Sequence, residues 1–432
     1  MLILPNQLFN VKNLRKDEDV ILYEHPHYFE DYNYNKKKLI LHRASMKYYE
    51  EYLKNNGIRV KYYTFKQKLP KKIFKLFEPG NKLNILNLSE KCELLDSPNF
   101  LLTHDDHEKY RDKTDKFFFN SFYMYGKKVI NVIPNIKSMD KENRNNMPKT
   151  VKIPKIPDNV KDSEYIDEAK KYVNKYFPNN YGNVDNFIYP VTHKTAKNWL
   201  RDFVEKRLKN FGKYQDAMLQ NESYLFHSIL STSINIGLLN PLEIIKYIEK
   251  VCDLGIPINS YEGYVRQLFW REYQLYCYHY LNFEGENYFK NKTKLSKKWY
   301  TGELGIKPVD DCIVKGFDTG YLHHIERLMV IGNFMNLKKI DPDDGFRWFM
   351  EFPCDSYEWV MYQNVYDMVF FITGGKTMRR PYISSSNYIL KMSNYKKEEW
   401  SDEWDDLYYD FLKLNKNKLW KFRYHFRGLK NV

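Results

Sequence analysis

The 432-residue sequence is poor in cysteine and lacks the spacings that cysteine sites need. Its five cysteines are scattered, with an odd total and no CxxC pair. Sulfur-ligated metal clusters and disulfide frameworks depend on such pairs, so we expect neither of them, and we expect a reducing, intracellular compartment, cytoplasmic or nuclear. The five are Cys92, Cys252, Cys277, Cys312 and Cys354.

Long apolar runs are also missing, and no stretch is long enough to span a membrane. The N-terminal stretch MLILPNQLFN has neither the basic flank nor the cleavage signature of a signal peptide. We therefore expect a soluble protein whose first residues form a buried strand. No GxGxxG motif follows that strand, which excludes the nicotinamide-binding fingerprint.

Positive charge and aromatic side chains are abundant. The net charge is +14, and aromatic residues make up 17% of a chain that is 43% hydrophobic. This composition excludes disorder, and the length allows two domains with a large core. The excess of Lys and Arg fits a polyanionic partner, because such side chains release counterions near phosphates. A surface that merely keeps the protein soluble is the alternative, and net charge does not separate the two.

Residues 1–130 alternate short strand patterns with helical ones. An amphipathic helix is expected at 35–55, closed by the Asn56-Gly57 pair that is typical of a left-handed C-cap. This rhythm predicts a parallel sheet covered by helices, in a doubly wound α/β domain. Strands are expected at 2–4, 20–22, 59–65 and 83–88.

Residues 131–190 form a polar, proline-containing connector, and residues 191–432 show helical patterns throughout, which predicts an all-α domain. Thr192 is expected to cap a helix that runs through Phe211 and is ended by Gly212. Further helices are expected at 225–235, 241–253, 261–282, 321–337 and 404–414.

The helix expected at 321–337 carries two histidines and an arginine on an otherwise apolar surface. His324 shares a face with Leu328, whereas His323 and Arg327 fall on the next face. Buried polar groups of this kind need partners. Two satisfied core histidines with a structural salt bridge are one interpretation, and a functional cluster is the other.

Several blocks of the sequence, in order, resemble the photolyase and cryptochrome superfamily. The chain looks most like the prokaryotic branch called iron–sulfur bacterial cryptochromes and photolyases, or prokaryotic (6-4) photolyases. The resemblance implies an α/β antenna-type domain, an all-α domain that binds FAD, and UV-damaged DNA as the partner of a monomer without membrane association. The blocks are DKENR (140–144), 190–218, HSILSTSINIGLLNP (227–241), EGYVRQLFWREY (262–273), YLHHIERLMVIGNF (321–334), DSYEWV (355–360) and 380–395.

The resemblance gives residues of several blocks a role in FAD binding. Ser228 and Ser231 lie near the start of an expected helix, where hydroxyls and free N–H groups favour a diphosphate; ordinary capping is the alternative. Arg327 is expected to form a bidentate ion pair with Asp355 beside the flavin. The other implied FAD-binding residues are Tyr214, Leu230, Asn333, Asn364 and Met361, the last of which stands where the branch has a glutamate.

Four residues are implied to face the DNA lesion. They are Gln267, Trp270, Arg271 and Tyr382. An aromatic ring next to an arginine can stack on a flipped base and reach its phosphate. A core tryptophan beside a surface arginine is the alternative for Trp270 and Arg271.

His323 and His324 match the His pair of superfamily members that repair (6-4) photoproducts. A protonated imidazole can give a proton to the lesion as an electron arrives, and we expect His324 to be the principal donor with His323 supporting it. By the same resemblance, Trp348 keeps one member of the electron-transfer chain toward the flavin. Tyr300 replaces a tryptophan further out.

The sequence departs from the branch at its metal cluster and at its antenna. Three of the four cluster cysteine positions fall on Pro308, Lys396 and Glu399, and Cys312 is one helical turn from its expected place. Thiolates are required for such a cluster, so we expect no iron–sulfur cluster and no metal. Tyr34-Asn35 replaces a His pair that helps to bind a lumazine antenna, which leaves a second chromophore open.

The leading hypothesis is a light-driven deoxyribodipyrimidine photolyase that uses reduced FAD to split a UV-induced pyrimidine dimer by electron transfer. The (6-4) photoproduct is favoured because of His323 and His324. A cyclobutane dimer is the alternative, since the lost cluster and Met361 mark a divergent lineage. Two further alternatives are a cryptochrome-type photoreceptor without repair activity and a cofactor-free nucleic-acid-binding protein.

Overall fold

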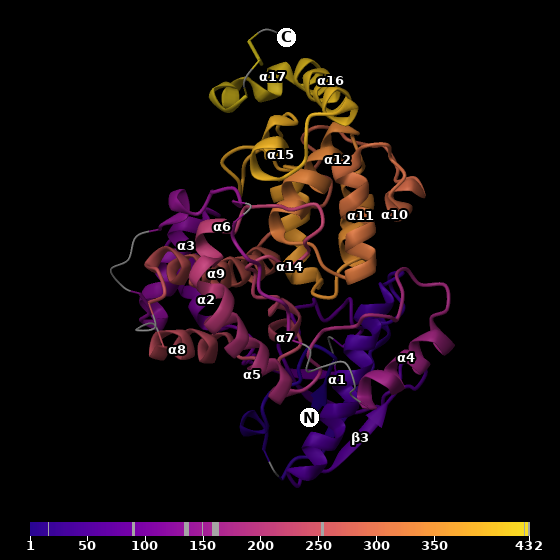
Figure 1. Cartoon of the computed structure of the whole chain (residues 1–432). Coiled ribbons are helices and arrows are strands. Elements are labelled where there is room, and N and C mark those ends of the chain that lie inside the picture. The colour runs from indigo at the N-terminus through magenta and orange to yellow at the C-terminus, as the bar shows by residue number, and fades with distance from the viewer. Residues whose placement is uncertain are drawn as a thin grey trace.

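The computed structural model describes residues 1–15, 17–88, 91–133, 138–148, 150–157, 164–251, 255–426 and 428–430. An α/β region is followed by a region built from helices (Figure 1). Cys252 and the end of the helix predicted at 241–253 lie outside the described residues. No described helix combines the length and the apolar character needed to cross a membrane.

The sheet has five parallel strands in the order β3-β2-β1-β4-β5. The order reverses on the two sides of β1, which makes the carboxyl ends of β1 and β4 the switch point of a doubly wound fold. This confirms the predicted fold class. The strands are β1 (Leu2–Ile3), β2 (Val20–Tyr23), β3 (Val60–Tyr63), β4 (Phe74–Phe77) and β5 (Cys92–Leu95).

The strand predicted at 83–88 is wrong. This segment forms turns, with Asn87 in the left-handed region at φ +52°. The segment has an apolar pattern because Leu86 and Leu88 are buried under the loop. The true fourth and fifth strands carry Lys75 and Glu93 in short runs, which hid them in the sequence.

Helix α1 (Lys36–Asn55) confirms the predicted helix at its boundaries. The Asn35 side chain accepts a hydrogen bond from the Lys37 N–H, and Gly57 follows the helix at φ +80°. Figure 1 shows α4 (Glu164–Tyr176), from the predicted connector, lying on α1. The domain boundaries at 130 and 190 stay predictions.

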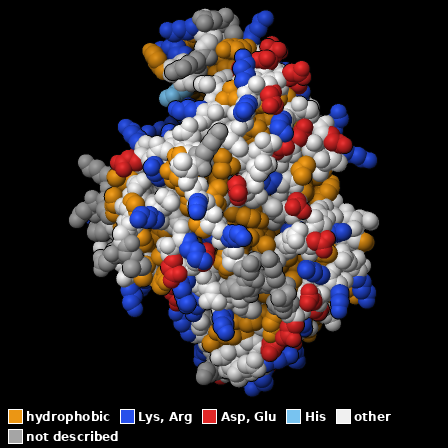
Figure 2. Space-filling model, in the orientation of Figure 1, with side chains coloured by type: hydrophobic (Ala, Val, Ile, Leu, Met, Phe, Trp, Pro, Cys, Tyr) orange, Lys and Arg blue, Asp and Glu red, His pale blue; other side chains and the backbone are white. Residues whose placement is uncertain are grey.

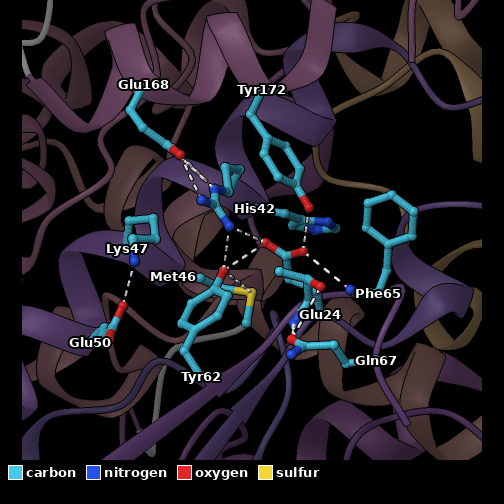
Figure 3. Close-up of polar contacts among 12 residues, drawn as sticks. Glu24, His42, Met46, Lys47, Glu50, Tyr62, Phe65, Gln67, Glu168 and Tyr172 are labelled. Atoms are coloured by element: carbon cyan, nitrogen blue, oxygen red, sulfur yellow. Dashed lines mark hydrogen bonds and ion pairs between the residues drawn. The ribbon is translucent and has the colours of Figure 1, made fainter. Parts of the chain in front are cut away.

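A buried carboxylate attaches α4 to the α/β region (Figure 3). Glu24, just after β2, accepts hydrogen bonds from Arg43 Nη1 at 2.8 Å and from the hydroxyls of Tyr62 and Tyr172 at 2.7 Å each. Arg43 also binds Glu168 on α4, with Nη2 2.6 Å from Oε1. We call these five residues the Glu24 cluster. It stabilises α4 against the sheet because every charge in it has a partner.

Thr192 caps α5 (His193–Asp202), as predicted, through a capping box with Thr195. The helix then runs through a π-helical segment, η4 (Phe203–Arg207), and α6 (Leu208–Tyr214). Gly212 therefore does not end it. The glycine is needed for packing instead, since a Cβ there would lie 2.7 Å from the Asn259 carbonyl oxygen.

The helix predicted at 321–337 begins later than expected. Residues 321–323 are not helical, because Gly320, at φ +68°, ends α11 and the Thr319 hydroxyl accepts a hydrogen bond from the Tyr321 N–H. Helical structure starts at His324 and continues through the π-helical segment η6 (Glu326–Gly332) and α12 (Asn333–Leu337).

All regular elements that follow β5 in the described residues are helices, which confirms the all-α prediction for the C-terminal half. Both halves share one continuous apolar core. The remaining elements are η1 (Val11–Asn13), η2 (Pro26–Tyr28), α2 (His104–Arg111), α3 (Phe119–Ile130), η3 (Asp140–Glu142), α7 (Ser231–Asn235), α8 (Pro241–Val251), α9 (Ile258–Tyr280), α10 (Lys298–Thr301), α11 (Lys307–Thr319), α13 (Pro342–Glu351), α14 (Glu358–Gln363), η7 (Asn364–Val369), α15 (Asn387–Met392), α16 (Glu399–Leu414), α17 (Lys416–Leu419) and η8 (Trp420–His425).

Candidate functional site

Helical structure runs from His324 through η6 and α12 to Leu337, and we call this stretch the central helix. His324 lies at its start with an exposed side chain. Burial nevertheless lowers its pKa to about 4, and the charge of Arg327 lowers it further. His324 is thus open to solvent while the surrounding protein disfavours its charged form. His324 is therefore neutral at pH 7 in this structure.

His323 lies deeper and stacks on His227. The two ring centroids are 4.6 Å apart with an interplanar angle of 17°. Burial, followed by the charges of neighbouring groups, holds the pKa of His323 well below its usual value. Neither ring nitrogen of His323 has a hydrogen-bond partner among the described residues. His227 lies in one of the quoted sequence blocks, but nothing in its spacing predicted this stack.

Arg327 and Asp355 form the expected ion pair, but its geometry differs from the prediction. Arg327 Nη2 lies 3.0 Å from Asp355 Oδ1 and 3.2 Å from Oδ2. The predicted bidentate pair is wrong, because Nε donates to the Leu322 carbonyl oxygen at 2.7 Å instead. The arginine thus also fixes the non-helical segment that precedes His324.

The two candidate serines lie next to this ion pair. The Ser231 hydroxyl, at the start of α7, donates to Asp355 Oδ2 at 2.7 Å. The Ser228 hydroxyl accepts from the Leu230 N–H at 3.3 Å. Between them Ile229 has φ +55°, an unfavourable conformation for a β-branched residue. Strain of this kind gathers at ligand sites, and both serine side chains are half-buried.

A chain of hydrogen bonds continues from Asp355 to Arg271. The Asn235 amide donates to the Asp355 carbonyl oxygen at 2.9 Å and accepts from Arg271 Nε at 3.0 Å. We call Ser231, Asp355, Arg327, Asn235 and Arg271 the Asp355 network. It joins α7, α9 and the central helix. Sequence reasoning missed Asn235, although it lies in the same block as the serines.

Arg271 is enclosed by protein and is not a surface residue. Its Nη1 donates to the Asn99 carbonyl oxygen at 2.6 Å, and Glu272 Oε1 lies 3.4 Å from the same nitrogen. The guanidinium also lies over the rings of Phe100 and Trp359, at 4.5 and 4.7 Å. Burial lowers its pKa to about 10. Its role at DNA stays a prediction.

The other three lesion-facing candidates are half-buried. One face of the Trp270 indole is covered by Phe119, with ring centroids 3.7 Å apart and planes at 8°. Arg380 lies over the Tyr382 ring at 5.5 Å. Gln267 lies one turn before Trp270 on α9. Trp270 and Gln267 thus share a helix with Arg271, and their lesion-facing roles stay predictions.

Two predicted FAD-binding asparagines are engaged in protein contacts. The Asn333 amide is buried and donates to the Ser384 carbonyl and hydroxyl oxygens at 3.1 and 3.0 Å. Asn364 donates to the Val360 carbonyl oxygen at 2.6 Å and is half-buried. Asn333 thereby fixes the segment that follows Tyr382.

The remaining FAD-binding candidates are apolar or aromatic and buried. Tyr214 packs with Phe226, their centroids 5.8 Å apart, in a small cluster outside the main core. Leu230 and Met361 belong to the main core. The FAD-binding roles of these residues stay predictions.

Trp348 and Tyr300 belong to one row of aromatic rings. Trp348 is fully buried, 4.6 Å from Phe352 and 5.8 Å from Phe317 by ring centroids. Phe317 lies 5.7 Å from Tyr300, which stacks on Tyr181 at 4.4 Å. The row runs outward from Phe352, whose ring lies 5.3 Å from the Arg327 guanidinium. Trp348 is thus nearer to Arg327 along this row than Tyr300, and the roles of both in electron transfer stay predictions.

The positions predicted to have lost cluster cysteines carry no substitute ligand set. Pro308 opens α11, Glu399 opens α16, and Lys396 is exposed. Cys312 is buried, and burial holds the pKa of its thiol well above the usual value. Among the described residues, no group of three or more His, Cys, Asp or Glu could hold a metal ion. That the protein binds no iron–sulfur cluster stays a prediction.

Tyr34 and Asn35, which replace the antenna His pair, are committed to protein contacts. The Tyr34 hydroxyl donates to the His27 carbonyl oxygen at 2.7 Å, and its ring lies under Lys38 Nζ at 4.3 Å. Asn35 caps α1 and donates to the Phe317 carbonyl oxygen at 2.8 Å. Both side chains are buried, and the second chromophore stays an open prediction.

Sequence comparisons place relatives along most of the chain. A family described as deoxyribodipyrimidine photo-lyase-related protein matches residues 1–189. The (6-4) photolyase of Agrobacterium fabrum is 38% identical over 296 residues, which are 65% of this chain and 58% of that protein. The chain thus spans less than two thirds of that relative. Uncharacterized protein R855 of Acanthamoeba polyphaga mimivirus is 57% identical over 91 residues, which are 21% of this chain and 74% of that protein.

Solved structures share the fold across nearly the whole chain. A bacterial class III photolyase from Agrobacterium tumefaciens superposes with a TM-score of 0.61 at 15% identity, over 95% of this chain and 86% of that one. A cryptochrome from Synechocystis sp. PCC6803 does so with a TM-score of 0.61 at 14% identity, over 96% and 89%. At such identities the likeness shows the fold alone.

Proposed function

Because the chain belongs to the photolyase and cryptochrome superfamily, we propose that it is a light-driven DNA photolyase that acts as a monomer on UV-damaged DNA in a reducing, intracellular compartment. Its substrate would be a UV-induced pyrimidine dimer, and the (6-4) photoproduct is the favoured lesion. The observation that carries the proposal is the position of His324, exposed beside the Arg327 end of the Asp355 network.

The residues around this network fit FAD. The hydroxyls of Ser228 and Ser231 border open space on a strained turn. The buried hydroxyls of Thr232 and Ser233 have no hydrogen-bond partner among the described residues, which a bound polar group would correct. Excited, reduced FAD would supply the electron that opens the dimer. The Arg327–Asp355 ion pair would hold the central helix and the Asp355 loop on either side of it.

His324 would hold and deliver the proton. The imidazole is neutral in the lesion-free protein, so the DNA itself must favour its charged form. A phosphate within a few ångströms does this, because a nearby anion raises the pKa of an imidazole. His323 would support the donor from below, held by its stack on His227. A lesion seated over His324 would exclude bulk water, so the proton would stay with the pair until the electron arrives.

The test is repair of defined oligonucleotides under equal illumination. One set carries a (6-4) photoproduct and the other a cyclobutane dimer, and both are given to wild type and to His324→Asn. We expect wild type to repair the (6-4) lesion and the variant to lose about 10²–10⁴ in rate while binding the same DNA, because a general acid has been removed. His104→Asn, at a distant exposed histidine, is the matched control and should repair normally.

The outcomes separate the parts of the proposal. Undiminished (6-4) repair by His324→Asn would remove the role of the His pair. Repair of the cyclobutane dimer alone would change the lesion but keep the photolyase. Colourless protein after expression with excess flavin would remove FAD, and with it the reaction.

A photoreceptor without repair activity is the second candidate, and the enclosure of Arg271 favours it. Its Nε and Nη1 are engaged by Asn235, the Asn99 carbonyl and Glu272, and Nη2, which has no hydrogen-bond partner among the described residues, is buried away from the surface where a DNA phosphate would lie. A protein of this kind would be yellow and photoreducible, and would repair neither lesion. The same two oligonucleotides therefore decide between the candidates.

A further inference from the structure

The last described element of the chain exposes large aromatic rings. Eleven large hydrophobic side chains are exposed among the residues that the structure describes, and the aromatic ones are Tyr409, Trp420 and Tyr424. Trp420 is 45% exposed and Tyr424 is 83% exposed, both on η8. All other Phe, Tyr and Trp side chains among the described residues are at least partly buried. Exposed rings at this place therefore indicate a contact surface.

This element is anchored and not frayed. Leu419, Phe426 and Leu429 are buried, and Phe422 packs edge-on against Phe371 with centroids 5.4 Å apart. These residues recur every three or four positions and form the inner face. Because the buried residues hold the inner face against the protein, the rings of Trp420 and Tyr424 lie on the opposite face, toward solvent.

The same element is positively charged. The sequence has no Asp or Glu in residues 411–432. Its cations bind neutral oxygens: Lys418 Nζ donates to the Tyr288 carbonyl oxygen at 2.6 Å and Lys421 Nζ to that of Gly374 at 2.9 Å. Their charge is therefore not cancelled by these bonds. Figure 2 shows blue and orange side chains meeting at the upper left, with red ones to their right over α16.

Arg423 joins the two exposed rings. Its guanidinium carbon lies 5.4 Å from the Trp420 centroid and 4.6 Å from the Tyr424 centroid. Arg423 Nη1 donates to the Trp420 carbonyl oxygen at 3.1 Å, which fixes its position. Two flat aromatic surfaces with a cation between them are thus held ready. This is the chemistry that binds unpaired bases and their phosphates.

We propose that the segment 416–425 is a second nucleic-acid site, which binds single-stranded DNA without regard to sequence or damage. Bases would stack on Trp420 and Tyr424, and Lys421 and Arg423 would neutralise the adjoining phosphates. The segment belongs to the same body as the lesion-facing residues, because Trp404 Nε1 of α16 donates to the Ser384 carbonyl oxygen at 3.0 Å, two residues after Tyr382.

The test uses undamaged DNA in the dark, so that it does not depend on photolyase activity. The full chain is titrated into a fluorescein-labelled oligo(dT) of about 16 nucleotides, a length within the range of known single-strand sites, and anisotropy is read over a series of KCl concentrations. Trp420→Ala with Tyr424→Ala should weaken binding about tenfold or more, and Trp420→Phe with Tyr424→Phe should keep it. Lys421→Gln with Arg423→Gln should lower the slope of log affinity against log salt by about 1.4, or about 0.7 for each phosphate.

The matched control removes the same charge elsewhere. Lys71→Gln with Lys72→Gln, two exposed lysines of the α/β region, should leave the affinity and the slope unchanged. The proposal is overturned if both the alanine pair and the glutamine pair bind oligo(dT) as wild type does. It is also overturned if the control pair weakens binding as much as Lys421→Gln with Arg423→Gln. Loss of binding to phosphatidylserine vesicles with oligo(dT) binding unchanged would assign the surface to a membrane instead. Should the alanine pair fail to fold, the salt slope of the glutamine pair decides.

Discussion

Arg327 and Asp355 are joined through one nitrogen, Nη2, which lies 3.0 and 3.2 Å from the two carboxylate oxygens. The second donor of the guanidinium, Nε, is spent on the Leu322 carbonyl oxygen. Asp355 in turn accepts from the Ser231 hydroxyl. One arginine thus positions a carboxylate, a serine and the segment before His324 at once.

Asp355→Asn should lower the stability of the protein and its FAD content together. Arg327 would remain largely buried without its counter-charge, which costs about 3 kcal/mol when one partner of a buried pair is removed. Ser231→Ala is the matched control, because it removes one hydrogen bond to the same carboxylate and should cost about 1 kcal/mol. Urea unfolding gives the first quantity and flavin absorbance per chain the second. Equal unfolding of Asp355→Asn and wild type would contradict this.

Arg271→Ala and Trp270→Ala should fail in different ways. Removal of Arg271 leaves Glu272 buried without its cation and should cost about 3 kcal/mol of stability. Removal of Trp270 loses its stack on Phe119 and should cost only about 1 kcal/mol of stability, but about 1–3 kcal/mol in affinity for damaged DNA. Chemical unfolding and titration with a lesion-bearing duplex measure the two effects. If Trp270→Ala bound damaged DNA like wild type, α9 would not face the lesion.

Trp348→Phe should abolish most photoreduction of bound FAD, because the buried indole is the inner oxidisable ring of the aromatic row. Tyr300→Phe should slow the reaction less severely, and Tyr300→Trp should speed it, since indole gives up an electron more readily than a phenol. The bleaching of flavin absorbance under blue light with an external reductant reports the rate. Tyr181→Phe keeps the outer stack and serves as the control. Equal rates in Trp348→Phe and wild type would mean that another route supplies the electron.

His107→Phe should make the protein more resistant to acid. Burial lowers the pKa of His107 to about 3, and both ring nitrogens have no hydrogen-bond partner among the described residues. The unfolded chain binds a proton near pH 6.5 and the folded chain does not, so the histidine destabilises the fold as the pH falls below 6.5. Between pH 7 and pH 5 the loss is about 2 kcal/mol for this residue alone.

The measurement is urea unfolding of wild type and His107→Phe at both pH values. The ring should be accommodated because His107 already packs beside Phe122 and Tyr276. His104→Phe, at an exposed neighbour, should leave the pH dependence as it is in wild type. If His107→Phe lost as much stability between pH 7 and pH 5 as wild type, protonation of His107 in the unfolded chain would not be the cause of that loss.

Local signals in the sequence were reliable where one residue decides a structure. The helix at 35–55, the Thr192 cap and the Arg327–Asp355 pair were all predicted and are all present. The strands β4 and β5 were not, because Lys75 and Glu93 break the apolar pattern of strands whose pairing is decided by the neighbouring chain.

Contacts between distant segments could not be predicted at all. The enclosure of Arg271 depends on Asn99 and Asn235, which lie 172 and 36 residues away in the sequence. The stack of His227 on His323 joins two loops through the fold. Since neither contact leaves a periodic pattern, an arginine expected to meet a phosphate was found bound within the protein.

The Glu24 cluster sets an order of events during synthesis. Glu24 leaves the ribosome 148 residues before Tyr172, and Arg43 leaves it 125 residues before Glu168. At about 5–20 residues per second, the buried carboxylate waits roughly 7–30 seconds for its last hydroxyl donor. In that interval the nascent α/β region holds Arg43 without its second carboxylate. We expect the α/β region to reach its final fold only after α4 has been synthesised. Folding of this region would then depend on a segment that is translated after it.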